Sequence, residues 1–234
     1  MPFFLKKRNE QLIEKMDRPD CDTHLLFNTY KQFTTINRLI SGWQNVYKKH
    51  IRPVLTDPSK IYSILDIGCG GGDIIKLLDE LTKMDGYQVR LTGIDPDSRA
   101  IQFLSNRDWP ENVTFLQASS SDLIEKNRSF DIVISNHLVH HLTNSELTEV
   151  CTDAEKLASK KIIFNDIERS DIGYGSFRVF ASLIFHNSFI VEDGLTSIKR
   201  SFRKQELKEA LPDNWQVHRQ FPFRLLATLD VKTS

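Results

Sequence analysis

Three consecutive glycines, residues 70–72, constrain the fold of this chain more than any other feature. Residues 61–67 read IYSILDI, an apolar run typical of a buried parallel strand. After the glycines, apolar side chains recur at helical spacing, namely Ile74, Leu77, Leu78 and Leu81. Because glycine lacks a Cβ atom, the turn can adopt positive φ and a ligand can approach its backbone. The pattern predicts a strand, a tight turn and a helix whose N-terminus offers free N–H groups.

Two kinds of nucleotide-binding loop have this shape, and a purely structural turn is the third interpretation. A dinucleotide loop, GxGxxG, needs a small residue where this chain has Asp73, so a nicotinamide oxidoreductase is disfavoured. The chain instead has Asp-x-Gly-x-Gly-x-Gly from Asp66 to Gly72, which resembles the first motif of the class I S-adenosylmethionine-dependent methyltransferases. In that family the loop faces the amino-acid and ribose parts of the cofactor. The resemblance implies cofactor contacts from Asp66, Gly68, Cys69 and Gly70.

The second predicted strand, residues 87–95, ends in an acid and is followed by Pro96 at a helix start. In nucleoside-binding α/β folds, an acid at this place accepts hydrogen bonds from ribose hydroxyls. We therefore predict that Asp95 binds the ribose and that Pro96 lies beside the cofactor. The alternative role for Asp95, capping the helix, suits Asp97 or Ser98 better.

The third predicted strand, residues 113–118, departs from the related pattern. Many members of the family carry an acid directly after this strand that accepts a hydrogen bond from the adenine amino group. Here that position is Ser119. Either Ser119 or Ser120 replaces the acid, or Asp122 reaches back, or backbone and apolar contacts alone hold the adenine.

The fourth predicted strand, residues 130–135, leads into the turn NHLVHHL, residues 136–142. Ligands of open parallel sheets bind at the carboxyl ends of the strands near the switch in strand order, which places Asn136 beside the methionine part of the cofactor. The turn resembles that of small-molecule methyltransferases and differs from the Asn/Asp-Pro-Pro-aromatic motif of enzymes that methylate amide or base nitrogen. A neutral imidazole is a suitable general base, so His140 and His141 are catalytic candidates. The alternative is that they bond to backbone groups, and His137 is expected to be structural.

Acceptor contacts are expected from segments on both sides of this core. Residues 1–58 form a predicted helical extension or lid, in which Asn37 and Trp43 are candidates to reach a ligand near the break at Gly42. Residues 59–234 form the predicted catalytic domain, with an apolar helical insert at residues 171–203 that either walls the acceptor pocket or forms a dimer interface. Two further candidates for acceptor binding are Arg169, which could instead form a salt bridge with Glu168 or Asp166, and Tyr174.

Composition excludes several classes of partner. Lys plus Arg and Asp plus Glu both number 31, so no net charge attracts nucleic acid or an anionic membrane. The three cysteines, Cys21, Cys69 and Cys151, lack the spacing of a metal or redox site and suggest a reducing compartment. With no signal peptide and no apolar span, we expect a cytoplasmic monomer or homodimer, without a metal and without membrane insertion.

These observations favour an α/β fold with a doubly wound, mostly parallel, seven-stranded sheet, closed by an antiparallel pair at residues 215–221 and 224–231. Residues 36–43, 165–170 and 222–224 resemble a bacterial group often found near polyketide or quinone biosynthesis. The resemblance implies direct methyl transfer from S-adenosylmethionine to a small, partly apolar phenolic, quinone or polyketide-like acceptor. The alternative is a non-catalytic module that binds S-adenosylmethionine or another nucleoside.

Overall fold

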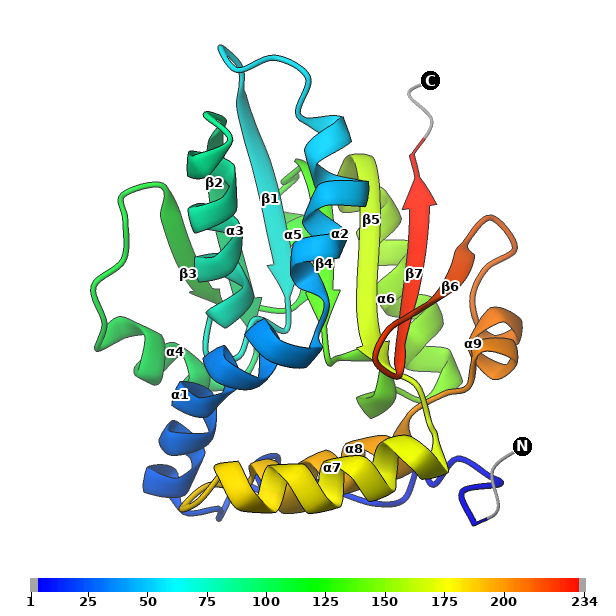
Figure 1. Cartoon of the computed structure of the whole chain (residues 1–234). Coiled ribbons are helices and arrows are strands. Elements are labelled where there is room, and N and C mark those ends of the chain that lie inside the picture. The colour runs from blue at the N-terminus through cyan, green and yellow to red at the C-terminus, as the bar shows by residue number, and fades with distance from the viewer. Residues whose placement is uncertain (1–3, 232–234) are drawn as a thin grey trace.

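A seven-stranded sheet forms the centre of the computed structural model, which describes residues 4–231 (Figure 1). Its strand order is β3-β2-β1-β4-β5-β7-β6, and β7 alone among these seven runs in the direction opposite to the other six. The predicted architecture is therefore confirmed. The strands are β1 (Ile61–Ile67), β2 (Gln88–Asp95), β3 (Val113–Gln117), β4 (Phe130–Asn136), β5 (Ala158–Ile167), β6 (Gln216–Gln220) and β7 (Arg224–Asp230).

Helices cover both faces of the sheet because its central strands are apolar on both sides. Along β1, Ile64 packs into the core beneath α3 (Asp73–Met84), whereas its neighbour Leu65 packs into the core beneath α6 (Asn144–Leu157). The crossover helices are completed by α4 (Ser98–Ser105) and α5 (Ser120–Glu125). The chain order reverses between β1 and β4, so the ligand crevice is expected at the carboxyl ends of these two strands.

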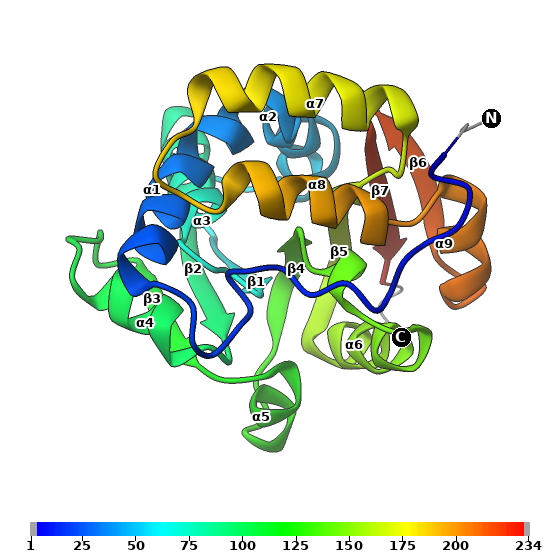
Figure 2. The ribbon, with the colours of Figure 1, turned by 90° about the horizontal axis from the view of Figure 1, so that it is seen from below.

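Two helical segments lie across that carboxyl edge (Figures 1 and 2). The first is α1 (Thr23–Ile40), after which the chain continues over one face of the sheet as α2 (Trp43–Val46) and the short turns Tyr47–Ile51 and Arg52–Val54 (Figure 1). The second, the predicted insert, comprises α7 (Asp171–Ile184) and α8 (Ile190–Arg200), followed by α9 (Lys204–Ala210). Gly42, at φ 71°, separates α1 from α2, as expected for a residue that must adopt the left-handed conformation. No helix within residues 4–231 combines the length and apolarity that a membrane span requires.

Residues 4–22, the N-terminal strap, form no regular helix although they belong to the predicted helical extension (Figure 2). Apart from short turns such as Asp17 N–H to the carbonyl of Glu14 (3.2 Å), several of their backbone groups bond to side chains of the insert. Asp193 accepts hydrogen bonds from the backbone N–H groups of Lys15 (2.7 Å) and Met16 (3.0 Å), and Arg203 donates to the carbonyl of Leu5 (2.6 Å). The domain boundary drawn at residue 58 stays a prediction.

The strap-side end of β2 is packed too tightly for a side chain at Gly93. A Cβ atom there would lie 2.7 Å from Cδ1 of Phe115 and 2.8 Å from Sγ of Cys69. Gly93→Ala is therefore expected to lower the free energy of unfolding by about 1–3 kcal/mol in urea titrations. The matched control is Gly175→Ala, because Gly175 lies inside α7 with open space around it. Alanine should raise the stability there by about 0.5–1 kcal/mol, and equal stability of the two variants would contradict this packing.

Candidate active site

A cavity of about 660 Å³ opens at the carboxyl ends of β1 and β4. One end lies against the glycine turn and the end of β2, where its lining includes Gly68, Gly70 and Asp95. The other end lies between α1, α7 and α8, where apolar side chains predominate. These include Phe33, Ile36, Phe177, Ala181, Phe185 and Ile190. The cavity therefore joins a polar end to an apolar end at the switch in strand order.

Positive φ angles shape the glycine turn, with φ 72° at Gly68, 49° at Gly70 and 72° at Gly72. The backbone N–H groups of Gly68 and Cys69 donate to the carbonyl of Ile94 (2.9 and 3.0 Å), which fastens the turn to β2. The N–H of Gly70 donates to Oδ2 of Asp95 (2.9 Å). The turn predicted from the glycines and the acid predicted at the end of β2 are thus directly bonded, and both line the cavity with Pro96.

Three carboxyl groups gather at the polar end, and no salt bridge neutralises them within residues 4–231. Burial raises the pKa of Asp66 and of Asp95, and raises that of Asp73 to about 6. Oδ1 of Asp66 is buried without a hydrogen-bond partner among the described residues. Such a group is costly in water-free surroundings unless a ligand supplies the missing donor or positive charge. This end of the cavity is therefore suited to a cationic ligand.

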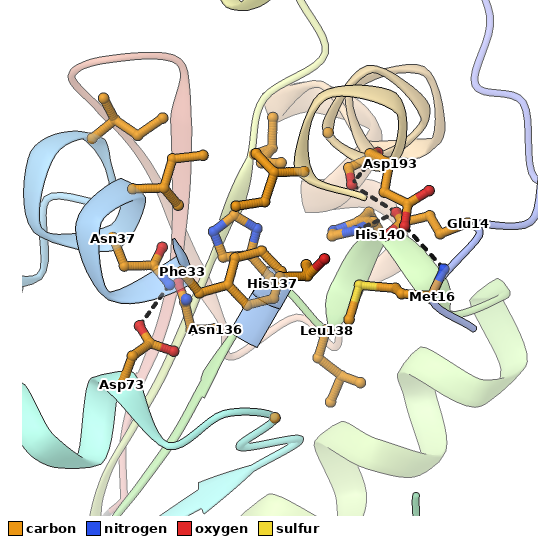
Figure 3. A pocket seen from close by; sticks show the side chains of 18 of the residues that line it. Glu14, Met16, Phe33, Asn37, Asp73, Asn136, His137, Leu138, His140 and Asp193 are labelled. Atoms are coloured by element: carbon orange, nitrogen blue, oxygen red, sulfur yellow. Dashed lines mark hydrogen bonds and ion pairs between the residues drawn. The ribbon is translucent and has the colours of Figure 1, made fainter. Parts of the chain in front are cut away.

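Asn37 and Asn136 present amide groups to the same cavity (Figure 3). Nδ2 of Asn37 donates to Oδ2 of Asp73 (2.7 Å). Oδ1 of Asn136 accepts from Nε1 of Trp43 (2.9 Å) and from Arg224 (3.0 Å). Because indole and guanidinium groups only donate, these contacts fix the orientation of the Asn136 amide and leave its N–H₂ group for a ligand.

His140 lies between two carboxylates, and this contradicts its predicted role as a neutral base. Nδ1 is 2.7 Å from Oδ1 of Asp166, and Nε2 is 3.2 Å from Oε1 of Glu14. Burial by itself lowers the pKa of His140, but the two carboxylates raise it to about 9. The ring is therefore an imidazolium at neutral pH and has no free lone pair with which to take a proton.

His141 lines the cavity beside this ion pair. Its Nδ1 is 3.1 Å from Oδ2 of Asp17, in the strap. A proton-transfer role for His141 stays a prediction.

Two trios of ligating side chains are close enough for a metal ion to bridge them. They are Glu14, His140 and His141, and His137, His140 and Asp166, with the ligand atoms of each trio within 4.8 Å of one another. Both trios share His140, whose two ring nitrogens already contact Asp166 and Glu14. We therefore assign the cluster to an ion-pair network that holds the strap.

Four predicted ligand contacts are corrected because their side chains do not line the cavity, and all four bond within the protein. Ser119 caps α5 by accepting from the backbone N–H of Asp122 (3.3 Å), and Ser120 donates to Asp153 (2.7 Å). Trp43 is buried and positions Asn136. Arg169 is also buried, and its guanidinium donates to the carbonyl of Ser201 (2.6 Å) and to Glu206 (2.5 Å).

Tyr174 is the fifth correction. Its ring lies edge-on against Phe4, with centroids 5.4 Å apart, and beneath the ammonium group of Lys199. The side chain therefore packs the strap against the insert and does not line the cavity.

The polar cavity residues that were missed from the sequence include Glu14, His137, Asp193 and Arg224. Glu14 lies in a charged segment without a motif, and Asp193 lies on the polar side of a helical pattern. Arg224 belongs to the triplet Pro222-Phe223-Arg224, which carried the narrower resemblance and was the one available signal. His137 has φ 61°, a left-handed conformation that is uncommon for histidine and concentrates at functional sites.

The ion pairs of His140 predict a pH-dependent contribution to stability. His140→Gln should lower the free energy of unfolding by about 3–5 kcal/mol at pH 6, because Asp166 and Glu14 lose their buried counter-ion. Since the folded pKa of about 9 exceeds the ordinary value of 6.5, the stabilisation is complete below pH 6.5 and is lost as the pH rises through 9. The deficit of the variant should therefore shrink toward pH 10.

Urea titrations of wild type and variant at a series of pH values measure this deficit. His141→Gln is the matched control, because the ring is partly exposed and should contribute only about 0–1 kcal/mol. A His140→Gln deficit that does not change between pH 6 and pH 10 would refute the imidazolium assignment.

Sequence comparisons place the central part of the chain among methyltransferases. Residues 64–161 match a family model described as a methyltransferase domain. The chain is 27% identical over 165 residues to a ubiquinone biosynthesis O-methyltransferase of Bartonella quintana, covering 69% of this chain and 63% of that protein. An uncharacterized methyltransferase of Bacillus licheniformis is 29% identical over 107 residues, covering 45% of this chain and 47% of that protein. The chain thus spans between about half and two thirds of the length of these relatives.

Solved structures share the fold at low sequence identity. The plantazolicin methyltransferase BpumL, in complex with a triazolic desmethylPZN analog and SAH, has a TM-score of 0.60 at 15% identity, covering 90% of this chain and 96% of that chain. A SAM-dependent methyltransferase from Aquifex aeolicus has a TM-score of 0.56 at 15% identity, with coverages of 88% and 98%. Residues 64–161 are thus similar to a methyltransferase domain, and the chain shares the fold of these solved methyltransferase structures.

Proposed function

We propose that this protein transfers the methyl group of S-adenosylmethionine to a small, partly apolar acceptor of the phenolic, quinone or polyketide-like kind. The main support for the proposal is one continuous cavity, which joins the acid-lined glycine turn to the apolar space between α1, α7 and α8. A non-catalytic nucleoside-binding module would have no use for the apolar end. The ubiquinone O-methyltransferase relative supports an acceptor of this chemistry.

The residues at the polar end fit S-adenosylmethionine, which carries an ammonium and a sulfonium charge. The unpartnered Oδ1 of Asp66 would accept a hydrogen bond from the ammonium group. Asp95, already bonded to the turn through Gly70, would accept from the ribose hydroxyls. The free N–H₂ group of Asn136 would donate to the methionine part.

Because Ser119 and Ser120 do not line the cavity, other groups would have to contact the adenine. Among the alternatives left open by the sequence, we favour apolar contacts, because Pro96 lines the cavity together with Met16 and Leu138, which Figure 3 labels. Met16 belongs to the strap, and its backbone N–H donates a hydrogen bond to Asp193 (3.0 Å). The strap would thus cover the cofactor.

The chemistry asks little of the protein beyond alignment. When bound, S-adenosylmethionine supplies a methyl group on sulfonium sulfur, so the nucleophile forms a bond to the methyl carbon while the carbon–sulfur bond breaks and its electron pair stays on sulfur. The chain must hold the nucleophile in line and exclude water, which together can contribute about 7–11 kcal/mol. Phe33, Phe177 and Ala181 would supply the dry surface on the acceptor side.

Calorimetric titration tests the cofactor assignment. Wild type should bind S-adenosylmethionine and S-adenosylhomocysteine and should not bind NAD. Asp95→Asn keeps the shape of the side chain but removes its charge, and the loss of charge-assisted hydrogen bonds should weaken binding by about tenfold or more. Asp108→Asn is the control, because Asp108 is exposed and does not line the cavity. Binding of NAD alone, or of none of these compounds, would refute the methyltransferase assignment.

A second pair of variants tests the acceptor end. Ala181 is buried at the apolar wall of the cavity, whereas its neighbour Ser182 is exposed on the outer side of α7. Ala181→Phe should therefore fill acceptor space and weaken the binding of alkyl-substituted phenols by about tenfold, the equivalent of one to two buried methylene groups. Ser182→Phe should not. Equal effects of the two substitutions on phenol binding, measured with S-adenosylhomocysteine present, would contradict this assignment of the wall.

A further inference from the structure

Arg224 brings a buried positive charge to the cavity. Within residues 4–231, none of its hydrogen bonds ends on a carboxylate. Its side chain is buried at the start of β7 and lines the cavity. Its donors reach Oδ1 of Asn165 (3.2 Å), Oδ1 of Asn136 (3.0 Å) and Nε2 of His137 (3.0 Å), all of them neutral acceptors. Buried charges are normally paired, so a bound anion would supply the counter-ion that the hydrogen bonds of this guanidinium lack.

Burial lowers the pKa of Arg224 and the charge of Asp166 opposes this effect, but Asp166 is already hydrogen-bonded to another cation. Asp166 accepts three hydrogen bonds, two from His140 and one from the backbone N–H of Ile167 (2.6 Å). Burial by itself raises the pKa of Asp166, but the charge of His140 reverses this and lowers it, with smaller contributions from His137 and Arg224. Its negative charge is thus balanced by the His140 imidazolium, and it makes no direct contact with Arg224 among residues 4–231.

Arg224 also fixes the protonation of His137. An arginine N–H can only donate, so Nε2 of His137 must accept and the single proton of the neutral ring must lie on Nδ1. Burial and the positive charge of Arg224 keep the pKa of His137 well below its usual value, against the opposing effect of Asp166. Within residues 4–231, no hydrogen bond ends on Nδ1. His137, which lines the cavity, therefore carries an N–H group without a hydrogen-bond partner among the described residues, on a ring that Arg224 polarises.

The position of His137 matches the place where an acceptor would react. The residue follows Asn136 directly at the end of β4, and its left-handed backbone is held by the hydrogen bond from its N–H to the carbonyl of Asn165 (3.1 Å). In Figure 3 it lies between the Asn37–Asp73 pair and the Glu14–His140 cluster, beside Phe33. The donor thus lies at the junction of the polar and apolar ends of the cavity.

We propose that His137 and Arg224 form an oxyanion subsite that binds the ionised hydroxyl of the methyl acceptor, which is accordingly an acidic phenol or enol and not an amine. The inference rests on the proposed function and names the chemistry of its acceptor. Nδ1–H of His137 donates to the oxyanion, and Arg224 acts as a positioning residue that holds the tautomer and supplies the charge. The hydroxyl proton leaves to solvent when the acceptor binds, so the oxygen is a nucleophile without a protein base.

Binding of 4-nitrophenol, with S-adenosylhomocysteine present, tests the subsite. At a pH below the pKa of free 4-nitrophenol, wild type should bind it about tenfold or more tightly than its neutral methyl ether, 4-nitroanisole. The bound chromophore should show the absorption of the phenolate. A wild type that binds neither compound, or that binds both equally, overturns the inference.

Three variants separate the subsite from a structural role. Arg224→Gln removes the charge but can keep the bond to Asn136, and His137→Asn removes the imidazole while tolerating the left-handed backbone. Both should lose about tenfold or more in 4-nitrophenol affinity and keep their affinity for 4-nitroanisole. Arg224→Lys, which keeps the charge, should recover most of the phenolate binding. Equal losses for both probes would mean that the residues only support the fold.

The cofactor provides the last control. S-adenosylhomocysteine carries a carboxylate, whereas 5′-methylthioadenosine has the same nucleoside without it. If Arg224→Gln weakens only the former, the subsite holds the cofactor carboxylate and the inference is wrong. Unchanged affinity for both, together with lost phenolate selectivity, supports it. Absence of binding of S-adenosylhomocysteine to wild type would instead refute the proposed function, so the two failures are distinguishable.

Discussion

The walls of the cavity depend on the ion pairs that the buried imidazolium of His140 forms with two carboxylates. One ring nitrogen contacts Asp166 at the end of β5, and the other contacts Glu14 in the N-terminal strap. Arg200 adds a second link, because its guanidinium donates to the carbonyls of His141 (2.8 Å) and of Leu12 in the strap. The sheet, the strap and α8 are thus joined through charges that are buried and hydrogen-bonded, and removing one partner would leave the others uncompensated.

The electrostatics of the cavity differ from one end to the other. The glycine turn is surrounded by three carboxyl groups without a salt bridge in the described part of the chain, those of Asp66, Asp73 and Asp95. At the junction with the apolar end, in contrast, the guanidinium of Arg224 has no carboxylate among its hydrogen-bond partners within residues 4–231. A cationic cofactor and an anionic acceptor would each relieve one of these imbalances. Their opposite charges would also favour the approach of the two reactants within a space from which water is excluded.

The fold was predictable from the sequence because alternating strand and helix patterns leave few ways to arrange a parallel sheet. The glycine turn and Asp95 were predictable for the same reason: each lies at a strand end whose position the pattern fixes. Arg169 and Tyr174 were misplaced, since a strand end shows which edge a residue occupies but not whether its side chain points into the cavity. His140 was assigned the wrong protonation state, because the strap that supplies Glu14 carries no motif.

Local sequence thus determined the strands, the glycine turn that lines the cavity and the helices that cover the sheet, because each depends on residues a few positions apart. Only the tertiary structure decided the protonation of the site. Glu14 lies 126 residues from His140, and Arg224 lies 87 residues from His137. Whether a histidine in this turn is a base, an imidazolium or a hydrogen-bond donor depends on such distant partners, and periodic patterns in the sequence contain no record of them.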